Sequence, residues 1–217
     1  MTAISCIPEN YYAWEWGDAL FVVLVPYWPT KNRGKDPWNR TLGTEQYQWL
    51  TQTLEQSTAS CKFVFIHYLL GGKDSASRGG VAIADKFEWG GQNVAGVDEF
   101  AEKRPGWEKP IHQLLVENNV SIVFHGHDHL FAKEELDGVI YQLVPQPGSR
   151  RYDNTRTAEE YGYVYGDVLS SPGHLRVEVS ENETRVEYVR AYLPKDEDEK
   201  ENRTNGELAY SYTVDVR

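Results

Sequence analysis

The alternation of apolar and polar positions predicts a chain in which buried strands alternate with amphipathic helices. Residues 19–25, 62–67 and 120–125 are largely apolar runs of strand length. Such runs are typical of strands that are buried on both faces of a sheet. Apolar residues recur at helical spacing in residues 44–54 and 110–119. This order of strands and helices predicts an α/β fold.

The second half of the chain has a different pattern, made of shorter strands. Residues 139–144 predict one strand, and residues 175–179 and 185–189 alternate apolar residues with Arg and Glu. Because one face of an alternating strand is polar, we expect the latter two to form a hairpin with one solvated face. Residues 195–205 are rich in charged residues, and residues 208–214 predict a last strand.

The composition limits the classes of function. Of the 217 residues, 40% are hydrophobic, which suffices for one domain with a sizeable core. The chain has 22 basic and 33 acidic residues and a net charge of -11. A surface of this charge argues against general binding of nucleic acid or of anionic membranes. A phosphate-bearing substrate would need a local positive charge, which a bound metal would supply.

Localisation and redox state stay open at this level. No apolar run approaches the length of a transmembrane helix. The first residues lack the basic and apolar regions of a signal peptide, so we assign no compartment. Cys6 and Cys61 could form a single disulfide bridge or remain two free thiols.

Histidines are concentrated at the ends of two predicted strands. One strand ends in His67, and another runs into His125, His127 and His129. Imidazole is the commonest protein ligand of divalent transition metals. Side chains at the carboxyl ends of neighbouring strands gather at one edge of an α/β sheet. We therefore expect a metal site at this edge.

The spacing within the histidine cluster predicts which side chains share a side. In an extended chain, His127 and His129 point one way, and Asp128 and Leu130 point the other way. His125 is then a neighbour at the end of the strand and is not assigned as a ligand.

Other metal-site motifs fit the cluster less well. The metallo-β-lactamase signature H-x-H-x-D-H is one residue longer than the histidine cluster of this chain. An amidohydrolase H-x-H belongs on the first strand of a barrel larger than this chain. The remaining histidines, His112 and His174, lie in a predicted helix and beside a predicted antiparallel strand, and we interpret both as ordinary structural residues.

Residues 71–105 form a long glycine-rich segment, which we interpret as a functional loop bordering the site. Arg78, Lys86, Trp89 and Asn93 of this segment could contact a substrate, although simple solvation is the favoured interpretation for each. The substrate-binding residues are therefore left unassigned.

Three features resemble the calcineurin-like metallophosphoesterases, the family that includes the purple acid phosphatases. Gly126-His127-Asp128-His129 resembles the last G-H-x-H motif of the family. His67, which ends a strand before a glycine-rich segment, resembles the preceding metal-binding histidine. Residues 42–50 resemble the helix that carries Gln and Trp-Leu between these motifs in phosphatase-like members.

The resemblance implies an α/β fold built as a sandwich of two mixed β-sheets flanked by helices. It also implies two divalent or trivalent metal ions, which are Fe, Zn or Mn in this family. By this resemblance, His67 and His127 would bind one metal and His129 the other. The implied activity is metal-dependent hydrolysis of a phosphate ester, as in a phosphatase or phosphodiesterase, by a water molecule that the metals acidify.

The resemblance covers only the C-terminal half of the family domain, whose N-terminal portion is missing. We assign residues 1–194 to this partial domain, and residues 195–217 to a charged linker and a terminal strand packed on it. The family places D-x-H, G-D and G-N-H motifs earlier, yet no histidine precedes His67, and Gly17-Asp18 precedes a strand instead of ending one. Tyr68 stands where many members have a second histidine. No catalytic residue is therefore assigned.

Three hypotheses follow from this partial match. The chain is a truncated piece of a metal-dependent phosphoric ester hydrolase, an inactive remnant that binds metal weakly or serves as a protein-interaction module, or one half of a two-chain enzyme whose N-terminal half is separate. We favour the first hypothesis, that the chain derives from a metal-dependent phosphoric ester hydrolase. For this polypeptide alone we expect weak metal retention and little hydrolysis, because imidazoles without a bridging carboxylate leave the metals underligated. We also expect bare apolar surface on one sheet.

Overall fold

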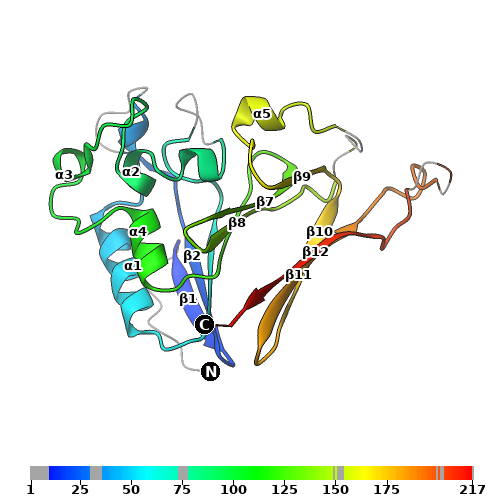
Figure 1. Ribbon diagram of the computed structural model, residues 1–217, viewed down its shortest axis with the longest axis horizontal. Coiled ribbons are helices and arrows are strands. Elements are labelled where there is room, and N and C mark those ends of the chain that lie inside the picture. Colours follow the sequence, from blue (N-terminus) through cyan, green and yellow to red (C-terminus); the bar gives the residue numbers. More distant parts are fainter. Residues whose placement is uncertain are drawn as a thin grey trace.

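A seven-stranded sheet forms the centre of the computed structural model, which describes residues 10–29, 36–72, 78–148, 150, 154–198, 200 and 203–216 (Figure 1). The apolar runs predicted as strands form β2, β5, β6 and β8, and these are neighbours in the sheet. In sheet order, the strands are β1 (Tyr12–Trp16), β2 (Ala19–Leu24), β5 (Cys61–Ile66), β6 (Ile122–His125), β8 (Val139–Leu143), β7 (Leu130–Leu136) and β9 (Asp167–Ser170).

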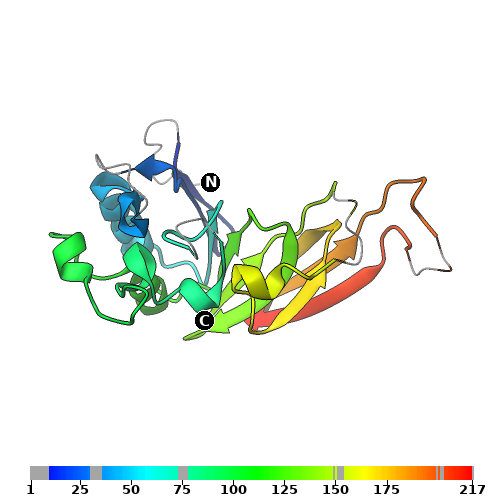
Figure 2. The same cartoon turned by 90° about the horizontal axis from the view of Figure 1, so that it is seen from above.

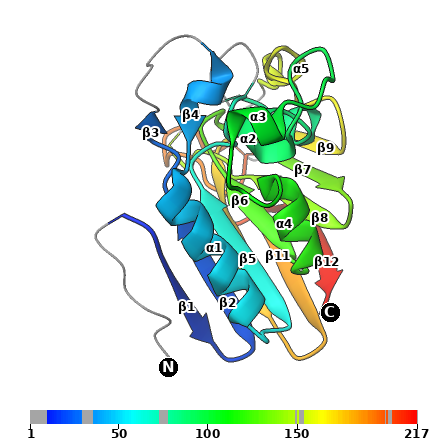
Figure 3. The same ribbon diagram turned by 90° about the vertical axis from the view of Figure 1, so that its left-hand side faces the viewer.

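The four central strands β2, β5, β6 and β8 are parallel, whereas β1, β7 and β9 run antiparallel to their neighbours. Parallel neighbours need a crossover connection. The helix α1 (Thr44–Gln56) lies between β2 and β5 in the chain, and α4 (Ile111–Glu117) lies between β5 and β6. Both helices cover the same face of the sheet (Figure 3). The carboxyl ends of β2, β5 and β6 therefore meet at one edge.

The core has two layers, because the central strands are apolar on both faces. Leu20 and Leu24 of β2 pack in one cluster with Leu50 of α1. Ala19 of β2 packs on the opposite face, in a cluster with Val186. Each fully buried leucine of this kind stabilises the fold by about 2 kcal/mol. The continuous apolar runs of the sequence thus predict correctly that both faces are covered.

A three-stranded antiparallel sheet covers part of the face opposite the helices (Figure 2). Its strands are β10 (Gly173–Val179), β11 (Glu183–Arg190) and β12 (Leu208–Asp215). The predicted hairpin and the predicted terminal strand are both confirmed. The α/β sandwich flanked by helices is confirmed as well, with the difference that the second sheet is antiparallel throughout these strands. A separate pair joins β3 (Trp28–Pro29) to β4 (Arg40–Thr41).

Residues 78–105 contain several short helices where the sequence predicts a glycine-rich loop. Trp89 is fully buried and donates a hydrogen bond from Nε1 to the hydroxyl of Tyr141 at 2.8 Å. Glu88 accepts a hydrogen bond from the Leu42 amide at 2.7 Å and forms a buried ion pair with Arg104. The short helices of the molecule are η1 (Pro37–Asn39), η2 (Val81–Ile83), α2 (Phe87–Gly90), α3 (Phe100–Lys103) and α5 (Ala158–Tyr161). No helix within the described ranges is long and apolar enough to cross a membrane.

The edge of the large sheet at β1 carries the bare apolar surface that was expected. Trp16 is 75% exposed and Tyr12 is 47% exposed. Beside them, Trp14 stacks on Phe21 with ring centroids 4.9 Å apart, and Phe21 stacks in turn on Phe65 at 6.5 Å. Half-exposed aromatic side chains thus extend across three neighbouring strands on the face opposite α1.

The structure shows the state of one of the two cysteines. Cys61 is a buried free thiol, with its Sγ atom 3.6 Å from the hydroxyl of Thr184. Cys6 lies outside the described residues.

Glu134 on β7 is a buried carboxyl group with one unsatisfied oxygen. The residue is 1% exposed, its Oε2 accepts a hydrogen bond from the Val81 amide at 3.0 Å, and its Oε1 has no partner within the described structure. Burial raises the pKa of this carboxyl to about 7, against the reference value of 4.5.

This raised pKa predicts a pH-dependent loss of stability that Glu134→Gln should remove. Between about pH 4.5 and pH 7 the folded state binds more protons than the unfolded state, so stability falls as the pH rises. We expect the variant to match the wild type at pH 4 and to exceed it by about 3 kcal/mol at pH 8. Urea unfolding across this range measures the difference. The neighbouring exposed residue gives the control, Glu135→Gln, and an E134Q profile parallel to the wild type would contradict the prediction.

Candidate metal and phosphate site

The pairing of β5 with β6 brings the two histidine motifs together at the carboxyl edge of the sheet. Ile66 pairs with His125 as the last parallel register position. One residue further along each strand, the Gly126 amide donates a hydrogen bond to the His67 carbonyl at 2.9 Å. This bond continues the sheet pairing beyond the strands and places His67 beside His127.

His67 and His127 form a close pair. The Nε2 atom of His67 lies 3.1 Å from Nδ1 of His127, and the two rings are nearly perpendicular, with centroids 5.2 Å apart. A metal ion about 2.1 Å from each nitrogen would form an N–metal–N angle of roughly 95°. This angle lies within the range of octahedral and tetrahedral coordination, so the pair fits two ligands of a single metal ion.

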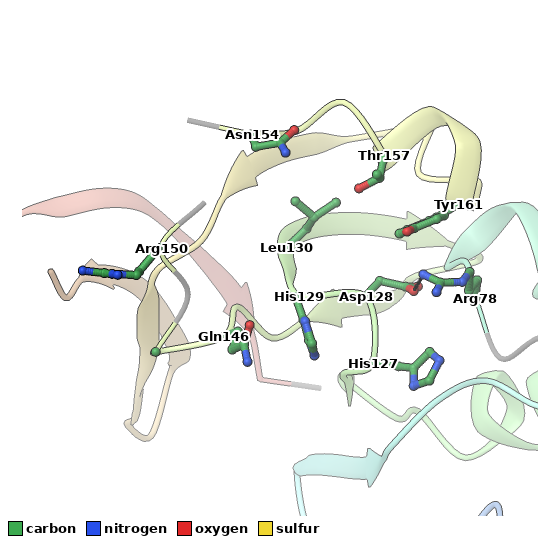
Figure 4. Close-up of a pocket in the computed structure, with 11 residues that line it drawn as sticks. Arg78, His127, Asp128, His129, Leu130, Gln146, Arg150, Asn154, Thr157 and Tyr161 are labelled. Atoms are coloured by element: carbon green, nitrogen blue, oxygen red, sulfur yellow. Dashed lines mark hydrogen bonds and ion pairs between the residues drawn. The ribbon is translucent and has the colours of Figure 1, made fainter. Parts of the chain in front are cut away.

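The bend that carries His127 and His129 is not extended. Both residues have left-handed backbone conformations, with φ of 81° and 57°, so the premise of an extended chain is wrong. The predicted division of side chains between two sides stays a prediction, because all four residues border the same cavity. Asp128 and Leu130 are buried, and Asp128 is directed toward Arg78 (Figure 4), whereas His129 is exposed and His127 half-buried.

The described residues do not fit a two-metal centre by themselves. Among them, no group of three or more His, Cys, Asp or Glu side chains is arranged to hold a metal ion. His129 is exposed and lies on the same bend, outside the close pair of His67 and His127. The dinuclear centre that the resemblance implies needs bridging carboxylates, and the nearest carboxylate in the motif, Asp128, is occupied elsewhere.

Asp128 anchors the bend through three hydrogen bonds. Its carboxylate accepts hydrogen bonds from Arg78 Nη1 at 2.9 Å, from the Gly79 amide at 3.2 Å and from the Tyr163 hydroxyl at 2.8 Å. Its side chain is fully buried. Left-handed conformations of residues other than glycine cost about 1–3 kcal/mol each and persist where surrounding contacts impose them. The three bonds of Asp128 are such contacts.

Burial lowers the pKa of His125 and of His127. Desolvation is the largest cause of the lowered pKa of His127, which favours the neutral imidazole that binds metals. His125 is fully enclosed, and burial lowers its pKa to about 3. The ring of His125 stacks on Tyr163 with centroids 6.2 Å apart. Its enclosure agrees with its assignment as a neighbour of the site.

Tyr68, which occupies the position of a second histidine in the family pattern, has its hydroxyl group bound by Pro26 and Arg40. Its hydroxyl donates a hydrogen bond to the Pro26 carbonyl at 3.0 Å and accepts one from Arg40 Nη1 at 3.0 Å. The ring itself packs edge-on against His127, with centroids 5.7 Å apart. Tyr27 lies at a similar distance from His67. Sequence reasoning missed Arg40 and Tyr27, because neither belongs to a motif.

The four residues of segment 71–105 that could contact a substrate lie in three different places in the structure. Trp89 belongs to the core. Lys86 and Asn93 line a cavity of about 490 Å³ beside Trp38. Arg78 lines a different cavity together with His127 and His129. Of the four, Arg78 is the residue that the fold places beside the histidine bend.

Three solved structures share this architecture. PhoD is similar with a TM-score of 0.58 and 16% identity, over 99% of this chain and 44% of PhoD. The purple acid phosphatase PPD1 from yellow lupin (Lupinus luteus) seeds has a TM-score of 0.53 and 14% identity, over 98% of this chain and 34% of PPD1. GAP50, the anchor in the inner membrane complex of Plasmodium, has a TM-score of 0.53 and 12% identity, over 96% of this chain and 54% of GAP50.

At these identities the likeness establishes the fold and not the activity. The chain spans between 34% and 54% of the length of these structures. No protein-family model matches the sequence, and a search of curated proteins finds no match. The two-sheet architecture and the solved structures together show that the chain has a metallophosphoesterase fold.

Proposed function

We propose that this chain carries the histidine part of the metal site of a metal-dependent phosphoric ester hydrolase. The observation that carries the proposal is the separation of 3.1 Å between His67 Nε2 and His127 Nδ1 at the carboxyl edge of parallel strands. The fold supports it, because two structures with the same architecture are a purple acid phosphatase and PhoD. His129 is the proposed ligand of a second metal ion.

The charge of the chain makes a metal necessary for phosphate binding. The net charge of -11 repels anions over most of the surface. When bound, a metal ion supplies local positive charge for the phosphoryl oxygens and acidifies a water molecule. The metal ions of this proposal are Fe, Zn or Mn, and the substrate is a phosphate ester.

The bridging carboxylates have to come from outside the described residues. His67 and His127 give one metal two ligands, whereas stable sites of this kind use three or four protein ligands. We propose that an N-terminal half of the domain, on the same or a second polypeptide, supplies the missing carboxylates. The chain alone then binds one metal weakly and hydrolyses little.

A second candidate function is that of an inactive remnant that binds metal weakly or contacts another protein. The exposed aromatic side chains of β1 favour this alternative. Trp16 and Tyr12 are exposed next to the half-buried stack of Trp14 on Phe21. Large exposed apolar patches of this kind mark interaction sites. Hydrolysis at saturating metal concentration, after addition of a polypeptide that carries the N-terminal half of the domain, discriminates between the two functions.

Metal binding should depend on the close histidine pair. We expect His67→Ala and His127→Ala each to weaken binding of Zn²⁺ or Mn²⁺ at least tenfold, because each removes one of two ligands. His129→Ala should have a smaller effect on the first metal, since it lies outside the pair. Isothermal titration calorimetry measures the affinities, and hydrolysis of aryl phosphate monoesters and diesters gives the activity.

The matched control is His174→Ala, because His174 is exposed on β10, in the second sheet. Equal loss of affinity in H174A and H67A would mean that the metal binds to surface histidines. Fast hydrolysis by the chain alone, with two tightly bound metals, would refute the proposal that further carboxylates are needed.

The hydrogen bonds of Asp128 should set the affinity of the histidine pair. Asp128→Asn weakens the bonds to Arg78 and Tyr163 without changing the size of the side chain. Tyr163→Phe removes a single donor. We expect each variant to lose about 1 kcal/mol of metal-binding free energy, roughly fivefold in affinity, because the left-handed bend becomes less fixed. Thermal unfolding verifies that the variants are folded. Asp215→Asn, at an exposed position in β12, is the control, and unchanged affinity in folded D128N and Y163F would contradict the prediction.

A further inference from the structure

A cavity of about 560 Å³ opens beside the histidine bend, between this bend and α5 (Figure 4). His127 and His129 line one side of it, and Thr157 and Tyr161 line the side of α5. We refer to it as the α5 cavity. A ligand held by the histidines has room in this cavity for a further group, and the lining residues determine which group fits.

The side of the cavity at Arg78 carries no unbalanced charge. The guanidinium of Arg78 is paired with the buried carboxylate of Asp128 at 2.9 Å. It also lies over the ring of Tyr161, at 3.8 Å from the ring centroid. These two contacts hold the guanidinium group of Arg78 at one side of the cavity. Because its charge is balanced by Asp128, Arg78 gives the cavity little preference for a second anion.

Arg150 does not change this balance. Figure 4 shows its side chain directed away from the cavity, and its Nε atom lies 3.6 Å from the carboxylate of Asp196. Within the described lining residues, both arginines are thus paired with carboxylates. Among the described lining residues other than the histidines, the neutral polar groups are then the ones that can select a ligand.

Three neutral polar side chains offer hydrogen bonds to a ligand. The side-chain amide of Gln146 and the hydroxyl of Thr157 belong to residues that line the cavity, and neither group forms a hydrogen bond with another described residue, whereas the backbone amide of Gln146 donates to Ser171 Oγ. Asn154 uses its Oδ1 atom to accept from the Arg156 amide, which leaves its NH₂ group for a ligand. An apolar ligand would cover these groups without pairing them, at a cost for each unmade bond.

We propose that the α5 cavity binds the alcohol portion of the phosphate ester and selects a hydroxyl-bearing group, such as a sugar, over an aryl group. The inference rests on the proposed function for the position of the phosphate, which the histidines hold through a metal. Gln146, Asn154 and Thr157 bind the hydroxyl groups. Tyr161 and Leu130 supply apolar surface for the carbon skeleton, as is usual in small-molecule sites.

Binding of three phosphates to the full chain with Zn²⁺ tests this selection. Titration calorimetry compares ribose 5-phosphate, phenyl phosphate and inorganic phosphate. We expect ribose 5-phosphate to bind at least fivefold more tightly than phenyl phosphate. Thr157→Val and Gln146→Met should each weaken ribose 5-phosphate roughly three- to tenfold, because each removes a hydrogen bond, and should leave inorganic phosphate unchanged.

The matched control is Thr155→Val, because Thr155 is exposed and does not line the cavity. It should bind all three phosphates as the wild type does. Equal affinity for phenyl phosphate and ribose 5-phosphate would overturn the inference. So would the absence of any effect of T157V and Q146M in folded protein.

A second measurement separates this inference from the proposed function. Failure of Zn²⁺ to bind at the histidine pair refutes the proposed metal site. In that case, ribose 5-phosphate is titrated into the metal-free chain, and the side-chain amide signals of Gln146 and Asn154 are followed by ¹H–¹⁵N NMR. Shifts that T157V reduces support the cavity independently of the metal. No shift at millimolar ligand, with and without Zn²⁺, overturns it.

Discussion

The parallel pairing of β5 with β6 is the constraint on which the candidate site depends. It brings together His67 and His127, which are 60 residues apart in the chain, through the bond from the Gly126 amide to the His67 carbonyl. A strand that slips by one residue turns all its side chains to the opposite face. Such a slip would exchange the side chains that now pack in the two core clusters on the two faces of the sheet. Burial of the core thereby fixes the distance between two exposed or half-exposed imidazoles.

The histidine bend adds a local constraint to this pairing. His127 and His129 both adopt left-handed backbone conformations, which non-glycine residues rarely adopt. Asp128 lies between them and forms three hydrogen bonds in a buried environment. One acidic residue thus links the bend to Arg78, near the start of segment 71–105, and to Tyr163, which follows α5 in the chain. The same contact shapes both the histidine pair and one wall of the α5 cavity.

A buried ion pair holds the long segment between the two histidine strands. Arg104 is paired with Glu88 and donates a further hydrogen bond to the Trp38 carbonyl at 2.6 Å. Glu88 also accepts from the Leu42 amide. Buried charges are tolerated when hydrogen bonds satisfy them, and removing one partner of such a pair costs about 3–5 kcal/mol. The pair therefore connects segment 71–105 to the chain that precedes α1.

The sequence by itself determined the elements whose signals are local. Continuous apolar runs identified the central strands, helical spacing identified α1 and α4, and the position of histidines after two strands identified the edge that carries the site. The motif around His127 also identified the metallophosphoesterase fold. These features depend on periodicity within a few residues, or on a short motif, and both are visible without a partner segment.

The tertiary structure decided the features that depend on contacts between distant segments. It decided that His67 lies beside His127, that Asp128 forms hydrogen bonds with Arg78, Gly79 and Tyr163, and that the Tyr68 hydroxyl is directed toward Pro26. It also decided how residues 78–105 pack, through hydrogen bonds that Trp89 and Glu88 form with distant residues. No local pattern encodes these outcomes, because each is the result of packing and hydrogen bonding between parts of the chain that meet only in the folded sheet.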